Sequence, residues 1–193
     1  KSQTNKSFFL KIFNYAKKKG VVCFSSVFDL ESVDFLENLK VPAYKISSFE
    51  INHIPLIDKI SKTGKPIIFS TGVATINDIS EAIKVCRKNR NNKIIILKCS
   101  SEYPASLRDC NLNYINFLEK KFKCLVGFSD HTKGITAPIA SILKGAVLIE
   151  KHFKINENKK FVDSDFSITP DKFKEMVTIG KSLKITFGKN NFK

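Results

Sequence analysis

Six short apolar segments of this chain each run directly into a cluster of polar, chemically able side chains, about once every two dozen residues. The junctions are F-S-S at 24–26, K-I-S-S-F-E at 45–50, F-S-T-G at 69–72, K-C-S-S-E-Y at 98–103, F-S-D-H-T at 128–132 and E-K-H-F at 150–153. Parallel α/β folds place their functional groups at the carboxyl ends of successive strands. The pattern therefore predicts a (β/α) barrel or a doubly wound sheet, with a functional site where the strands end.

The hydrophobic period alternates between that of strands and that of helices along the chain. Helices are expected to begin near residues 7, 29, 55, 75, 112, 135 and 170, and strands are expected at 21–24, 43–47, 66–70, 94–97, 125–128 and 146–149. A complete (β/α)8 barrel usually needs about 250 residues, and the chain has 193. We therefore expect one domain over residues 1–188, a partial TIM (β/α)8 barrel with about six of its eight strands and without the first two, and a tail at 189–193.

The net charge of +15 raises the possibility of nucleic-acid binding. Only three of the 33 basic residues are Arg, the residue that supplies bidentate recognition of bases and phosphates. The lysines are scattered over every predicted helix. We expect solvated helix faces and no nucleic-acid partner, while a general attraction for anionic substrates fits either interpretation.

The five cysteines and the absence of a long apolar run bear on location. The cysteines have no C-x-x-C spacing and mostly fall in or beside apolar segments, which indicates reduced structural thiols. No 18-residue apolar run and no signal-peptide core occurs. The expectation is a cytoplasmic protein without a membrane partner.

Two of the three histidines, His131 and His152, stand at the ends of neighbouring predicted strands. Side chains alternate along a strand, so Ser129 and His131 share one face and Glu150 and His152 the corresponding face. Two imidazoles at such positions can ligate one divalent metal and leave other coordination positions open. Asp130 or Glu150 could orient an imidazole. His53 is expected at the surface.

Small hydroxyls and lysines recur at the same strand ends. A barrel mouth often binds phosphate with hydroxyls, backbone N–H groups and a cation, and Ser26, Ser48, Ser70 and Ser129 together with Lys45 favour this over simple helix capping. The alternative of a Schiff-base lysine at 45, 98 or 151 stays open on spacing alone.

Three further candidates are isolated. Glu50 and Asp163 could serve as acid/base groups or bind sugar hydroxyls. Cys99 is a weak candidate for a nucleophile. No G-x-G-x-x-G motif or P-loop occurs, so a nucleotide cofactor is not implied.

Taken together, the junctions resemble the phosphoenolpyruvate-dependent nonulosonic acid synthases, which make N-acetylneuraminate, legionaminate and pseudaminate. The matching text is K-I-S-S-F-E at 45–50, T-G-K-P-I-I-F-S-T-G at 63–72, K-C-S-S-E-Y-P at 98–104, G-F-S-D-H-T-K-G at 127–134 and E-K-H-F at 150–153. Phe49 and the run D-S-D-F-S at 163–167 look more like the pseudaminate branch than the neuraminate branch.

The resemblance implies a transferase of carbohydrate biosynthesis that joins phosphoenolpyruvate to the aldehyde of an N-acetylated amino sugar, here 2,4-diacetamido-2,4,6-trideoxyaltrose. Neuraminate or legionaminate synthesis is the alternative, and a Schiff-base barrel aldolase the further alternative. By resemblance, His131 and His152 bind Mn2+ or Mg2+, and Glu50, His152 and Asp163 are catalytic. The implied phosphoenolpyruvate ligands are Ser26, Lys45, Ser48, Ser70 and Ser129, and the implied sugar contacts are Glu50, Tyr103 and Asp163. Ser101, a further substrate-binding candidate, stands where neuraminate synthases often have Asn.

Length is where the chain departs from this family. Family members begin with two further strands, the first ending in a Glu thought to handle the attacking water, and end with a small antifreeze-like domain that reaches into the partner's active site in a homodimer. We expect these parts to be absent from the 193 residues and the chain by itself to be inactive.

Overall fold

A computed structural model describes residues 5–156 and 162–188, and the predicted tail at 189–193 lies outside these ranges. The chain divides into two compact units, one formed by Lys1–Ser70 with Ala74–Ile95 and the other by Thr71–Val73 with Ile96–Lys193. The two units are described separately below.

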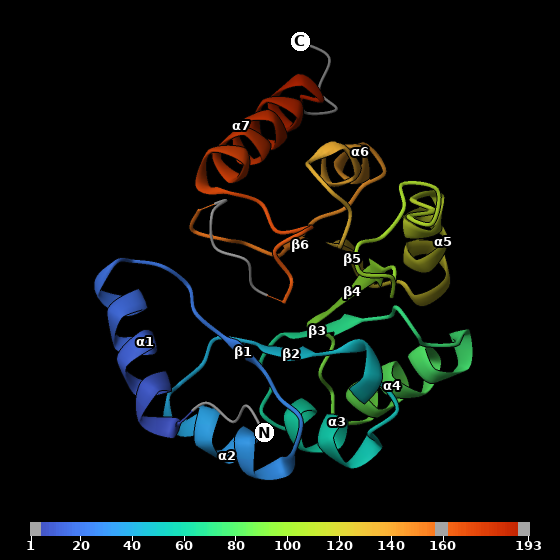
Figure 1. Ribbon diagram of the computed structural model, residues 1–193. Helices are drawn as coiled ribbons and strands as arrows, with labels where there is room; N and C mark the ends of the chain where they lie inside the picture. The colour runs from blue at the N-terminus through green and yellow to red at the C-terminus, as the bar shows by residue number, and fades with distance from the viewer. Residues whose placement is uncertain (1–4, 157–161, 189–193) are drawn as a thin grey trace. The chain divides into compact units, whose positions relative to one another are not determined.

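The first unit pairs three short parallel strands and covers them with helices. The strands are β1 (Ser25–Ser26), β2 (Tyr44–Ile46) and β3 (Ile67–Ser70), and the helices are α1 (Lys6–Lys18), α2 (Leu30–Asn38), the 3-10 helix η1 (Ser48–Glu50), α3 (Ile54–Ser61) and α4 (Ile76–Lys88). Helices α2, α3 and α4 lie side by side (Figure 1). Their apolar faces and the strands share a core in which Ile46, Leu56 and Ile67 are fully buried.

The second unit repeats this alternation. Its parallel strands are β5 (Leu125–Asp130) and β6 (Ile149–Lys151), and β4 (Ile94–Cys99) begins in the first unit and ends in the second. The helices are α5 (Asn113–Phe122), α6 (Thr136–Leu143) and α7 (Pro170–Thr186), of which α6 and α7 pack side by side (Figure 1).

Strand order decides between the two predicted fold types. The sheet runs β1-β2-β3-β4-β5-β6, in the order of the chain. A doubly wound sheet reverses its strand order at a switch point, whereas a (β/α) barrel adds each strand beside the previous one. The sequential order therefore confirms the six strands of a partial TIM-type barrel.

Local signals fixed several helix starts as predicted. Asp29 caps α2 by accepting a hydrogen bond from the Ser32 N–H at 2.7 Å. Thr75 and Asp78 form a capping box at the predicted start of α4, in which each side chain accepts from the other's backbone N–H. These caps satisfy N–H groups that a helix start leaves without partners.

Two predicted strands are displaced. The apolar run 21–24 is not a strand, and pairing begins only at β1, where Ser25 lies opposite Tyr44. Val21 and Val22 are exposed by 60% and 73%, so their side chains do not contribute to the core of this unit. The expected strand at 146–149 instead spans Ile149–Lys151, because the parallel register aligns Phe128 with Ile149 and runs forward from there.

Gly127 provides a test of packing in the second unit. A Cβ at this position of β5 would lie 2.4 Å from the Leu148 carbonyl oxygen and 2.6 Å from the Leu97 side chain. Because the backbone of Leu148 cannot move aside cheaply, Gly127→Ala should destabilise the fold by about 1–3 kcal/mol in urea denaturation.

Gly180→Ala in α7 is the control for that measurement. Its Cβ would meet only the flexible end of Ile142, at 3.0 Å, and the helix gains up to about 1 kcal/mol from the better helix former. We expect stability within about 1 kcal/mol of the parent. Equal effects of the two substitutions would contradict the packing described for β5.

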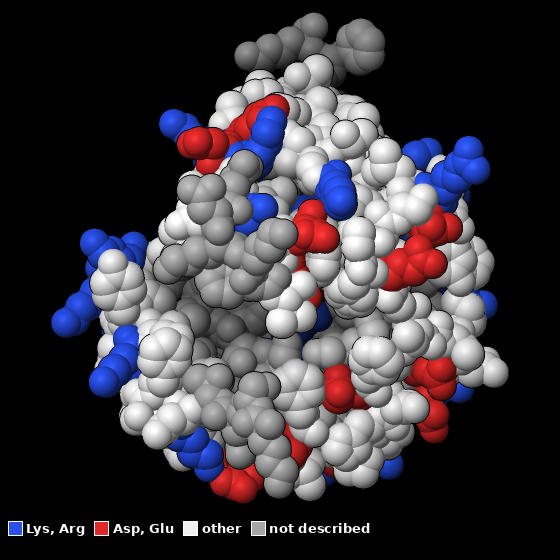
Figure 2. Space-filling view, in the orientation of Figure 1, with Lys and Arg blue, Asp and Glu red and all other residues white. Residues whose placement is uncertain are grey.

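On the face shown in Figure 2, Lys and Arg lie among Asp and Glu over most of the surface, while those over α1 at the left have no Asp or Glu beside them. Several lysines are paired with carboxylates, as in Lys59–Asp34 at 2.6 Å. No helix of residues 5–156 and 162–188 is long and apolar enough to cross a membrane.

Candidate active site

The candidate site of the second unit is built on the register of β5 and β6. Ser129 lies opposite Glu150, and Asp130 lies opposite Lys151. The Ser129 hydroxyl donates to Glu150 Oε1 at 2.6 Å. Because side chains alternate, the next position returns to the face of Ser129 and Glu150, and there the chain carries His131 and His152.

The two histidines lie close together, with ring centres 5.3 Å apart. Nδ1 of His131 is 2.9 Å from the Ser100 carbonyl oxygen. A carbonyl only accepts, so Nδ1 carries the proton of this hydrogen bond and Nε2 keeps its lone pair. Burial lowers the pKa of His131, although the bond to Ser100 acts in the opposite direction.

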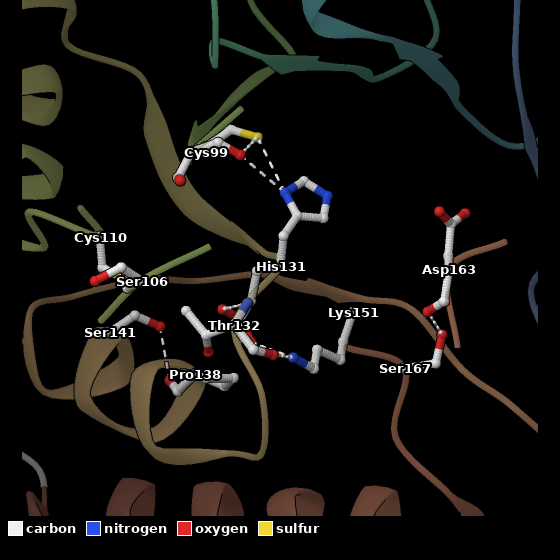
Figure 3. Close-up of polar contacts among 12 residues, drawn as sticks. Cys99, Ser106, Cys110, His131, Thr132, Pro138, Ser141, Lys151, Asp163 and Ser167 are labelled. Carbon is white, nitrogen blue, oxygen red and sulfur yellow. Dashed lines mark hydrogen bonds and ion pairs between the residues drawn. The ribbon is translucent and has the colours of Figure 1, made fainter. Parts of the chain in front are cut away.

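His152 has a different environment. Its side chain is 36% exposed, and its Nδ1 lies 3.5 Å from Oδ2 of Asp163. A cavity of about 730 Å3 opens beside it, lined by residues 152–155, 162–164 and Ser167. The Ser167 hydroxyl donates to the Asp163 carbonyl oxygen at 2.6 Å and holds this loop turn (Figure 3). Asp163 is thus the carboxylate that lies beside His152.

The histidine pair fits a shared metal ion. With metal–nitrogen bonds of about 2.1 Å and an N–metal–N angle of about 90–110°, two ligating imidazoles have centres roughly 4.6–5.3 Å apart. The observed 5.3 Å reaches this range. Over the described ranges, no cluster of three His, Cys, Asp or Glu side chains could hold a metal ion. Two protein ligands would leave several coordination positions for water or substrate oxygen.

Two aromatic rings enclose the histidines. Phe166, which is 3% exposed, has its ring centre 4.9 Å from His152 and 5.7 Å from His131. Tyr103 is 55% exposed, and its ring centre lies 4.1 Å from that of His131. Burial raises the pKa of the Tyr103 hydroxyl. Tyr103 therefore presents a largely exposed side chain with an uncharged hydroxyl, whereas Phe166 is buried against both histidines.

The predicted residues of the first unit cluster around β1, β2 and β3. Ser26 lies opposite Lys45, whose exposed fraction is 7%. Ser48 and Glu50 begin and end η1, and Ser70 ends β3. Within the part of the chain that the structure describes, Glu50 Oε2 and Ser70 Oγ are buried without a hydrogen-bond partner. Buried polar atoms are normally paired, so these two call for a ligand or an ordered water.

Sequence reasoning missed two contacts of the second unit. The Ser100 carbonyl sets the His131 tautomer, and no sequence signal marks a backbone carbonyl for this role. Asp130 and Lys151 form a buried ion pair, which strand alternation and opposite charge at matching positions could have indicated. Ser101 is exposed.

Six sequential parallel strands whose carboxyl ends carry the polar side chains form the arrangement of a partial TIM-type barrel, the class of fold in which enzymes place their active sites at those ends. The chain belongs to the NeuB family, whose model matches residues 1–191. It is 39% identical over 178 residues to the pseudaminic acid synthase of Campylobacter jejuni, covering 92% of this chain and 52% of that protein. It is 40% identical over 176 residues to the N,N'-diacetyllegionaminic acid synthase of the same species, covering 90% of this chain and 53% of that protein.

A solved structure supports the same assignment. The N-acetylneuraminic acid synthetase of Leptospira borgpetersenii matches with a TM-score of 0.94 at 29% identity, over 99% of this chain and 67% of that one. The chain spans about half the length of the curated relatives it matches. The near-equal identity to synthases of two sugars makes the choice of sugar a separate question.

Proposed function

We propose that the protein condenses phosphoenolpyruvate with the open-chain aldehyde of an N-acetylated amino sugar, giving a nonulosonic acid and phosphate. The observation that carries this proposal is the pair His131–His152 beside the Ser129–Glu150 hydrogen bond, at the carboxyl ends of two parallel strands. Membership of the NeuB family and relatives named as synthases of pseudaminic and legionaminic acid support the reaction class.

The reaction needs anion binding and charge stabilisation. The enol C3 of phosphoenolpyruvate attacks the aldehyde carbon, positive charge develops at C2, water adds there, and the tetrahedral intermediate releases phosphate by C–O cleavage. We assign Lys45, with the hydroxyls of Ser26, Ser48, Ser70 and Ser129, to the phosphoenolpyruvate anion. Fixed cations and hydroxyls of this kind need little reorganisation when charge develops; the Ser129 hydroxyl, which donates to Glu150 in this structure, must turn from that carboxylate to donate to the anion.

Other residues are assigned to binding the sugar and the metal. We assign Glu50, Tyr103 and Asp163 to sugar contacts or proton transfer, and His131 and His152 to Mn2+ or Mg2+. When bound, the metal supplies a Lewis acid for the aldehyde oxygen. His152 would then be held from its other side by Asp163, at 3.5 Å.

Comparing two amino sugars as substrates tests this function. The full-length protein that carries this sequence should release phosphate from phosphoenolpyruvate only when an amino sugar is added. Its kcat/KM should be highest for 2,4-diacetamido-2,4,6-trideoxyaltrose, by about 10- to 200-fold over N-acetylmannosamine. A 6-deoxy carbon needs apolar surroundings, and the cavity beside Asp163 is lined by Phe153, Ile155 and Val162.

A preference for N-acetylmannosamine would move the protein to the neuraminate branch and leave the metal and phosphate assignments standing.

Ile155→Ser should reduce the preference for the 6-deoxy sugar, and Ile185→Ser, at an exposed position of α7, is its matched control. Both parent residues are exposed, by 82% and 80%, so neither change should cost much stability.

The homodimer remains a prediction, which light scattering tests.

A Schiff-base aldolase is the second candidate, because burial lowers the pKa of Lys98 and a neutral amine is the nucleophile such an enzyme needs. Lys151 is a poor choice for this role, since its ammonium is buried against Asp130. Borohydride with substrate would trap a covalent adduct in the aldolase and none in the synthase.

A further inference from the structure

An ion pair on the opposite face of the sheet joins the ends of the two strands that lead into His131 and His152. Nζ of Lys151 on β6 lies 2.6 Å from Oδ2 of Asp130 on β5, and the side chains are 1% and 0% exposed. Lys and Asp are almost never buried to this extent unless they are paired, as they are here. A buried ion pair often stabilises a fold no more than apolar residues of similar volume would, so stability alone does not account for it.

The same two side chains hold the peptide that follows His131. Asp130 Oδ1 accepts a hydrogen bond from the Thr132 N–H at 3.0 Å. The Lys151 ammonium also donates to the Thr132 carbonyl oxygen (Figure 3). The residues on both sides of His131 are therefore held in place, because Asp130 belongs to the ion pair and Thr132 is hydrogen-bonded to both of its members. Lys151 immediately precedes His152.

The register of β5 and β6 links these contacts to the placement of the two histidines. Asp130 and Lys151 are register partners, and the histidines come one position later on each strand. A slip of one residue between strands would turn side chains to the other face. It would also separate the two buried charges. In Figure 3 the His131 ring and the Lys151 side chain leave their strands in different directions, as alternation requires.

We propose that Asp130 and Lys151 are positioning residues, which fix the spacing of His131 and His152 for a shared divalent metal ion. The inference rests on the proposed function, because it takes the histidine pair as the metal site. Neither side chain reaches the metal itself, since both lie on the far face. Their effect passes through the backbone of residues 131 and 152.

The double variant Asp130→Asn/Lys151→Met tests this role in the full-length protein. It removes both buried charges at nearly constant volume, so its melting temperature should stay near that of the parent, whereas each single variant leaves one charge unpaired and should melt lower. Mn2+ affinity measured by calorimetry should nevertheless fall about 10- to 100-fold in the double variant, as for other partners that orient metal ligands.

Glu37→Gln is the matched control. It breaks the part-buried Lys65–Glu37 ion pair of the first unit, 2.5 Å long, and should lower the melting temperature without changing Mn2+ affinity. Parental Mn2+ affinity in the double variant overturns the positioning role and leaves the proposed function intact. A parent that binds no Mn2+, or that binds it equally well as His131→Ala, overturns both. If the double variant does not fold, Lys151→Met measured below its own melting temperature decides in the same way.

Discussion

His131→Ala and His152→Ala should each reduce Mn2+ affinity by more than about 100-fold, beyond what loss of an orienting partner costs, and nearly abolish turnover. Each change removes one of two imidazoles whose centres lie 5.3 Å apart. Calorimetric titration of the full-length protein with Mn2+ measures the affinity, and circular dichroism checks that the fold is retained.

His53→Ala is the control for the histidine variants. His53 stands at the start of α3, where its side chain makes no capping hydrogen bond, and we expect parental affinity and turnover. If both His131→Ala and His152→Ala bound Mn2+ as the parent does, the pair would be structural. In that case the metal assignment would be wrong.

Lys45→Ala and Lys45→Met should raise the dissociation constant of phosphoenolpyruvate by about 10- to 150-fold, because a charge-assisted contact contributes roughly 1.5–3 kcal/mol. Lys45 lies on β2 opposite Ser26 and is 7% exposed, so the proposed contact with the anion would form in partly desolvated surroundings. Sugar affinity should change little. The Met variant keeps the length of the side chain and separates lost charge from lost packing.

Lys17→Ala, in the exposed last turn of α1, shows whether removal of any positive charge weakens anion binding. We expect no change there. A Lys45 variant that kept its phosphoenolpyruvate affinity and lost sugar affinity would reverse the assignment. Loss of a borohydride-trappable adduct in the same variant would favour the aldolase.

The sequence predicted most of the fold because its periods are local. The apolar stripe of α4, its capping box and the doubly covered strand β4 all follow from residues within one element. The strand at 21–24 was wrongly predicted for a physical reason: apolar residues favour a strand, but a strand forms only where a neighbour pairs with it. In this unit that pairing starts at Ser25.

The candidate site was partly predictable in the same way. Matching positions on successive strands placed His131 beside His152, and the register bears this out. The packing of Phe166 against both rings could not be read from the sequence, because it depends on how the loop after β6 returns to the site. The buried pairing of Asp130 with Lys151 required the observed register. The roles of Ser26, Ser48 and Lys45 rest on family resemblance.

The most direct test of the account follows one oxygen atom. Phosphoenolpyruvate labelled with 18O in the bridge between carbon and phosphorus is incubated with the full-length protein, Mn2+ and 2,4-diacetamido-2,4,6-trideoxyaltrose, and both products are analysed by mass spectrometry. We predict sugar-dependent release of labelled phosphate, matched one to one by an unlabelled nonulosonic acid, because the C–O bond breaks. Unlabelled phosphate, or no sugar-dependent release with either this sugar or N-acetylmannosamine, would contradict the proposed condensation.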